Sequence, residues 1–134
     1  MQTFLPYSDF QKSVKVLDYR RLGKQRLEAL QILEIISGRT PNSGWRNHPA
    51  VRMWKNNPDA LAEYYNFCVK EWICRGYKNT MELQKIQYPV KYPSWLGKEE
   101  FHSAHRSNLL RKNKEFYGNF GWTESSDLVY IWPV

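Results

Sequence analysis

The sequence contains little cysteine and no long hydrophobic run. The only two cysteines, Cys68 and Cys74, lie six residues apart in a segment that we expect to be one helix, which places them on different faces. This spacing argues against a disulfide framework or a thiolate zinc site. No apolar run approaches the roughly 18 residues that cross a bilayer, and the first residues lack the basic stretch and apolar core of a secretory signal. These absences favour a reduced, intracellular protein.

Acidic residues are also few: 13 Asp and Glu face 20 Lys and Arg in 134 residues, a net charge of +7. Two segments, 12–28 and 91–114, each carry six basic side chains against two acidic ones. Basic segments interleaved with aromatic residues are typical of nucleic-acid binding. Two solvated helix faces are the alternative. A membrane surface is disfavoured, because neither segment pairs its charge with a broad apolar face.

Helical periodicity and capping signals predict one all-α domain over residues 1–134. We expect three principal helices and one short helix, which span Ser8 to Gly38, Asn57 to Gly76, Lys98 to Lys112, and Pro49 to Lys55. Long loops connect them, and residues 77–97 are expected to be mostly irregular. The tail from Phe116 to Val134 is rich in aromatic residues and lacks a helical period, so we expect an extended Leu128–Trp132 segment packed on the core.

The middle of the first predicted helix carries a charged strip between apolar positions. Arg21, Lys24 and Glu28 share this strip, with Glu28 two turns after Arg21 and one turn after Lys24. Such spacing favours the ionised carboxylate. One interpretation is an ordinary intrahelical salt-bridge set. The other is a carboxylate held in a cationic cleft, which suits stabilisation of positive charge developing on a sugar. We therefore predict Arg21 and Glu28 as catalytic residues.

Further DNA contacts are predicted around this strip and in the following loop. Gly23 would let a DNA backbone approach the helix, and helix N-termini bind phosphates. An exposed Trp can stack on a base, so Trp45 is a candidate, whereas Trp54 is interpreted as a core residue. The DNA-binding candidates of these two regions are Arg20, Lys24, Arg26, Trp45, Arg46, Asn47 and His48.

The last helix contains His102 and His105 at i, i+3, a spacing compatible with a metal pair. Because the chain has only three histidines and no well-placed carboxylate, we expect no metal and no cofactor. We predict DNA contacts instead for His105, Arg106, Asn108, Arg111 and Lys112, with a capping or core role as the alternative for His102.

With these residues in view, the chain resembles the pyrimidine-dimer DNA glycosylase family, the phage endonuclease V-like proteins. The resemblance covers most of the chain and depends on the shared order of four motifs. These are Leu17-Asp18-Tyr19-Arg20-Arg21-Leu22, Asn47-His48-Pro49-Ala50-Val51, Arg75-Gly76-Tyr77, and Lys112 through Phe116-Tyr117-Gly118.

The resemblance implies a three-helix fold with an aromatic tail that acts on double-stranded DNA containing a damaged or modified pyrimidine. In that family the N-terminal α-amine attacks the deoxyribose C1′, a Glu on the first helix stabilises the transition state, and the resulting imine permits strand cleavage. Two positions differ here. Arg21 occupies the place of the family's Glu, for which Glu28 is our candidate. Gln2 is bulky, so we expect Met1 to be retained and to supply the amine.

Our leading hypothesis is therefore a DNA repair glycosylase, with or without lyase activity, that uses Met1 and Glu28. The alternative is a non-catalytic nucleic-acid-binding module that keeps the fold, and a histidine-bound metal hydrolase ranks last. We expect a monomer in the cytoplasm of a bacterial or phage-infected cell.

Overall fold

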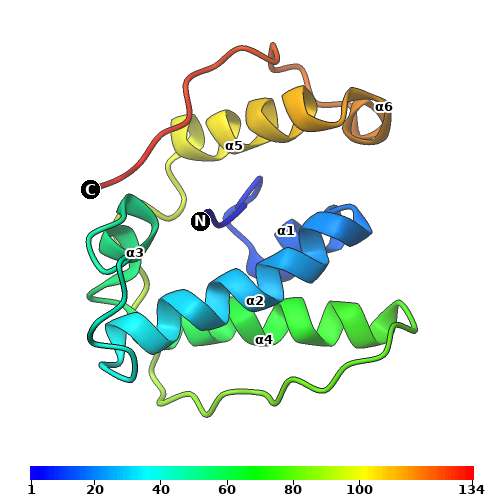
Figure 1. Cartoon of the computed structure of the whole chain (residues 1–134). Helices are drawn as coiled ribbons and strands as arrows, with labels where there is room; N and C mark the ends of the chain where they lie inside the picture. The colour runs from blue at the N-terminus through cyan, green and yellow to red at the C-terminus, as the bar shows by residue number, and fades with distance from the viewer.

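The computed structural model describes residues 1–134 and contains six α-helices, one 3₁₀ turn and no strand. Three of the helices are long, as expected, and Figure 1 shows their arrangement. The elements are α1 (Phe10–Lys15), α2 (Tyr19–Ile36), α3 (Pro49–Trp54), α4 (Pro58–Cys74), α5 (Glu99–Lys112), α6 (Lys114–Tyr117) and η1 (Gly118–Phe120). The all-α prediction is confirmed, and no helix is long and apolar enough to span a membrane.

The first predicted helix is in fact two helices, α1 and α2, separated at residues 16–18. Asp18 is the N-cap of α2, and its carboxylate accepts from the Arg21 backbone amide at 3.4 Å. The Asp18 backbone N–H is bound instead to the Tyr117 hydroxyl, at 3.0 Å. Periodicity missed this break because Val14, before it, and Leu22, after it, are both buried in the same core.

The tail also differs from the prediction at its start. Residues 114–120 form α6 and η1, and the Asn113 side chain caps α6 by accepting from the Phe116 amide at 3.2 Å. The later tail has no helix, and Ile131 and Trp132 pack against the core as expected. Leu128 and Val129, expected to pack there too, are exposed.

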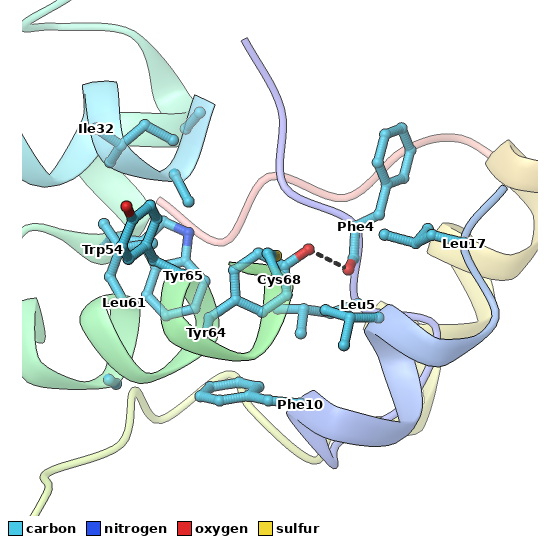
Figure 2. Packing of buried hydrophobic residues seen from close by; sticks show 14 of the residues in the cluster. Phe4, Leu5, Phe10, Leu17, Ile32, Trp54, Leu61, Tyr64, Tyr65 and Cys68 are labelled. Atoms are coloured by element: carbon cyan, nitrogen blue, oxygen red, sulfur yellow. Dashed lines mark hydrogen bonds between the residues drawn. The ribbon is translucent and has the colours of Figure 1, made fainter. Parts of the chain in front are cut away.

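The core lies where α2 and α1 pack against α4, and it is rich in aromatic residues. Trp54, predicted as a core residue, is fully buried together with Tyr64 (Figure 2). Gly23 serves this packing: a Cβ added there would lie 3.2 Å from ring atoms of Trp72 on α4. The expectation that Gly23 admits a DNA backbone is therefore wrong, because its open side faces α4.

Two segments without regular structure complete the molecule. Residues 77–98 run back along α4, where the Tyr65 hydroxyl donates to the Glu82 carbonyl at 2.7 Å (Figure 1). The N-terminal segment, residues 1–6, passes between α2 and α5 (Figure 1), and Phe4 and Leu5 within it are buried. The start of the chain thus lies inside the fold rather than on its periphery.

Candidate active site

The N-terminal segment is buried without secondary structure, so side chains must satisfy its backbone groups. Gln25 of α2 bonds to it twice: its Nε2 donates to the Gln2 carbonyl at 2.8 Å, and its Oε1 accepts from the Phe4 amide at 3.0 Å. The Tyr64 hydroxyl donates to the Phe4 carbonyl at 2.8 Å (Figure 2). Gln25 and Tyr64 therefore act as a strand partner would.

Two histidines of α5 hold the next residue of the segment. The Leu5 amide donates to His105 Nδ1 at 2.8 Å, and His102 Nδ1 donates to the Leu5 carbonyl at 2.7 Å. The Gly97 amide donates to His102 Nε2 at 2.9 Å. Burial lowers the pKa of His105 to about 3 and also lowers that of His102, so both rings are neutral at pH 7. The i, i+3 pair thus has a structural use.

Arg106 binds Pro6, the last residue of the N-terminal segment. Its Nη1 donates to the Pro6 carbonyl at 2.7 Å, and its guanidinium pairs with Glu124 at 2.9 Å and with Glu99. Both His105 and Arg106 are buried, at 0% and 8% exposure. The prediction that His105 and Arg106 contact DNA is therefore wrong, because their polar atoms face the protein's own backbone and carboxylates.

The other end of the segment meets Glu28. The Gln2 backbone amide donates to Glu28 Oε2 at 3.0 Å, and the Gln2 side chain donates to Asn108 Oδ1 of α5 at 3.2 Å. The α-amine of Met1 is three covalent bonds from that amide nitrogen. Asn108 thereby supports the chain start from the opposite side, and its predicted contact with DNA stays a prediction.

A basic pocket of about 470 Å³ opens at this point. Its lining includes Met1, Gln2 and Glu28 together with four cationic side chains. These cations come from the first half of α2 and the last residue of α5: Arg20, Arg21, Lys24 and Lys112. Glu28 is the only acidic residue of the lining. The predicted juxtaposition of one carboxylate with several cations is thus present, and it includes the chain start.

The interpretation of Arg21, Lys24 and Glu28 as an intrahelical salt-bridge set is wrong. Arg21 pairs with Asp18, 3.2 Å away, and no ion pair within 4.0 Å joins Glu28 to either cation. Burial raises the pKa of Asp18, but hydrogen bonds from Tyr117 and Arg21 outweigh burial and lower it overall. Asp18 therefore neutralises Arg21 in part, and Glu28 remains bound to Gln2.

The loop before α3 borders Met1 on another side. Trp45, Arg46 and Asn47 are exposed. His48 caps α3, because its Nδ1 accepts from the Ala50 amide at 3.0 Å. Burial and the positive N-terminal amine lower the pKa of His48, while Glu28 opposes this shift, so His48 lies within electrostatic range of both.

Two further predicted DNA contacts lie outside the pocket. The Arg26 guanidinium stacks over Trp72, 4.1 Å from the ring centroid, and donates to Asn79 Oδ1 at 2.7 Å. This placement gives Arg26 a packing role against α4. Arg111 is exposed and donates to the Leu128 carbonyl at 3.3 Å.

Our sequence reasoning missed Gln25, Tyr64 and Tyr130 as positioning residues. The Tyr130 hydroxyl donates to the Thr3 carbonyl at 2.9 Å, and Gln25 is only 1% exposed between buried Leu22 and Ala29. A polar side chain on the apolar face of a helix was the available signal, because buried amides require partners. The partner itself could not be read from periodicity.

Comparison with known proteins gives one family. Searches of curated proteins and of solved structures found no match. A family model described as pyrimidine dimer DNA glycosylase matches residues 1–85, which include the chain start, α2 and the loop before α3. With Met1, Glu28 and most of the basic pocket inside the matched region, the chain belongs to the pyrimidine dimer DNA glycosylase family.

Proposed function

We propose that this protein is a DNA repair glycosylase with lyase activity, in which the Met1 α-amine is the nucleophile and Glu28 stabilises the sugar cation. The observation that carries the proposal is the 3.0 Å hydrogen bond from the Gln2 amide to Glu28 Oε2 inside a basic pocket. It holds the first residue of the chain beside the one carboxylate of the lining. The proposed substrate is double-stranded DNA with a damaged or modified pyrimidine.

The reaction begins with attack of the amine lone pair on C1′ of the deoxyribose. The glycosidic bond breaks, and the base leaves with its electron pair and takes a proton. Positive charge develops on the sugar, where an ionised carboxylate stabilises it. Loss of the amine proton and opening of the sugar ring, whose oxygen is protonated, give an imine between the enzyme and C1′.

Strand cleavage follows from the imine. The imine acidifies the C2′ proton, and β-elimination expels the 3′ phosphate. Water then hydrolyses the imine and frees the amine. Arg20, Lys24 and Lys112 provide the charge to bind the phosphates on either side, and Arg21 does so while paired with Asp18.

The test is borohydride trapping on duplex DNA with an abasic site, together with base release from damaged DNA. We expect a covalent adduct whose modified peptide begins with Met1, and no adduct after acylation of the α-amine. Glu28→Gln keeps an oxygen that accepts from the Gln2 amide, so it should fold and yet lose about 10²–10³-fold in rate. Glu82→Gln, at an exposed side chain along α4, is the matched control.

One result would overturn the catalytic proposal. If the protein binds DNA in a salt-dependent manner but neither releases a base nor forms an adduct, it is a nucleic-acid-binding module that keeps the family fold. Glu28→Gln would then leave binding unchanged.

A further inference from the structure

His48, in the loop before α3, has one ring nitrogen occupied and the other free. Its Nδ1 accepts from the Ala50 amide at 3.0 Å, so the proton of the neutral ring is on Nε2. Nε2 has no hydrogen-bond partner within the protein and is not enclosed, since the ring is half-buried. His48 therefore presents one donor, Nε2–H, that a ligand can use.

Two tryptophans fix this ring beside the chain start. Trp45 meets the His48 ring edge-on, with centroids 5.4 Å apart, and lines a pocket together with Met1. Trp132 of the tail meets the ring on another side, with centroids 5.6 Å apart and planes at 87°. Trp132 also contacts the ring of Tyr130, which binds the N-terminal segment. Both supports of the His48 ring thus lead to the first residues of the chain.

The charges that act on His48 belong to the two groups proposed to react. Burial lowers the pKa of His48, the positive N-terminal amine lowers it further, and Glu28 opposes both. The ring is therefore neutral at pH 7. A neutral ring with Nδ1 bound to an amide donates from Nε2 and cannot take up a proton there. His48 is suited to donate a hydrogen bond and not to act as a general base.

We infer that His48 joins Met1 and Glu28 as a catalytic residue, and that its Nε2–H stabilises the ring oxygen O4′ when the deoxyribose opens. The inference rests on the proposed function. O4′ is bonded to C1′, so it lies two bonds from the Met1 nitrogen once the amine has attacked. A donor next to the amine is therefore placed to bind O4′.

The step that requires this donor is the breaking of the bond between C1′ and O4′. The nitrogen lone pair forms the second bond of the imine, and the electron pair of the broken bond moves to O4′. O4′ then takes up the proton that the amine loses. Negative charge develops on O4′ in this step, and a fixed neutral donor stabilises it. Glu28 cannot do so, because a carboxylate only accepts. His48 keeps its own proton throughout.

Two substitutions separate the roles of the two ring nitrogens. Asn is a favourable N-cap, so His48→Asn keeps an acceptor in place of Nδ1 but lacks the donor at Nε2. His48→Gln places an N–H near the reach of Nε2 but caps poorly. With the full chain, we expect His48→Asn to unfold at the wild-type urea concentration and yet to form the borohydride-trapped adduct about 10²-fold more slowly on abasic duplex DNA. His48→Gln should unfold at lower urea and trap faster than His48→Asn.

A second duplex tests the role of O4′ directly. It carries an open-chain aldehyde in place of the abasic sugar and lacks the 4′ oxygen, so no ring has to open. On this duplex the wild type, His48→Asn and His48→Gln should trap at equal rates. Asn42→Ala, at an exposed position of the same loop, is the matched control and should equal the wild type on both duplexes.

The outcomes distinguish this inference from the proposed function. No adduct of the wild type with either duplex overturns the proposed chemistry and the inference with it. If the wild type traps both duplexes, the proposed chemistry stands. The inference is then overturned if His48→Asn traps the abasic duplex at the wild-type rate, or if it is slowed equally on both duplexes. Slower trapping by His48→Gln than by His48→Asn would also overturn it, because the rate would then follow stability.

Discussion

Gln25 and Glu28 lie one helical turn apart on α2 and bind successive parts of the N-terminal segment. Gln25 is buried and holds the Gln2 carbonyl and the Phe4 amide, whereas Glu28 is half-buried and holds the Gln2 amide. Buried amides and carbonyls are costly when unpaired. Each of these two side chains therefore contributes both to folding and to the position of Met1.

Replacement of Gln25 by Met should destabilise the protein by about 3 kcal/mol, because it leaves the Gln2 carbonyl and the Phe4 amide without partners. It should also lower the yield of the trapped adduct, since the amine is no longer held beside Glu28. Urea unfolding measures the first effect and borohydride trapping the second. Gln11→Met, on the exposed face of α1, should change neither. A Gln25 variant with normal stability would show that the two bonds contribute little.

The break between α1 and α2 depends on Asp18, the N-cap of α2. A second aspartate, Asp9, is the N-cap of α1 and can be compared with it. Asp9 caps α1 from an exposed position, where its Oδ1 accepts from the Lys12 amide at 2.8 Å. Asp18 caps α2 from a buried position, and its carboxylate also accepts from the Tyr117 hydroxyl. The same residue type at the same helical position thus has different surroundings.

We expect Asp9→Ala to cost about 1 kcal/mol, the usual contribution of an N-cap. Asp18→Ala should cost roughly 2–4 kcal/mol, because it also leaves the buried Tyr117 hydroxyl and Arg21 without their partner. Urea unfolding of the two single variants measures the difference. In a Tyr117→Phe background the cost of Asp18→Ala should fall, and equal costs at both caps would contradict this account.

At the scale of the whole molecule, α5 is joined to the rest of the fold through the N-terminal segment that lies between α5 and α2 (Figure 1). His102 and His105 make that junction as neutral rings, His105 as an acceptor and His102 as both donor and acceptor. A proton on His105 Nδ1 would remove the bond from the Leu5 amide. The stability of the whole chain should therefore depend on pH.

The pKa of His105 is lowered by burial from the ordinary 6.5 to about 3, so between these values the unfolded chain binds a proton that the folded chain does not. Stability is then highest above about 6.5 and declines as the pH falls. We expect a loss of about 2 kcal/mol between pH 7 and pH 5 from this ring. His105→Asn, which keeps an acceptor but cannot titrate, should flatten this dependence in urea unfolding, whereas His48→Asn, at a half-exposed ring, should retain most of it.

The basic pocket should also determine how DNA binding responds to salt. Each phosphate-bound cation that is removed lowers the slope of log K against log salt by about one. Arg20→Gln and Lys112→Gln should each have this effect, because both cations line the pocket. Arg26→Gln is the matched control: its guanidinium stacks on Trp72 and bonds to Asn79, so the slope should stay unchanged. An altered slope for Arg26→Gln would show that DNA extends over that face.

Local sequence patterns were sufficient to predict much of the secondary structure of this protein. Apolar periodicity and capping signals located α4, α5 and the span that contains α2, and spacing placed Glu28 among cations, because each of these signals depends only on neighbouring residues. The break at Asp18 escaped the same reasoning, because the residue that receives its backbone N–H, Tyr117, lies 99 positions away along the chain.

The tertiary structure alone decided which charged and polar residues face the site. Arg26 and Lys24 are both cations of α2, yet the Arg26 guanidinium lies over Trp72 whereas Lys24 lines the basic pocket. His105 accepts from the Leu5 amide. The chain start is beside Glu28 because Gln25, Tyr64 and two histidines from three different helices satisfy a buried backbone that has no partner strand. Hydrogen bonds between segments so far apart in the chain produce no periodic pattern in the sequence. Only folding brings these segments together.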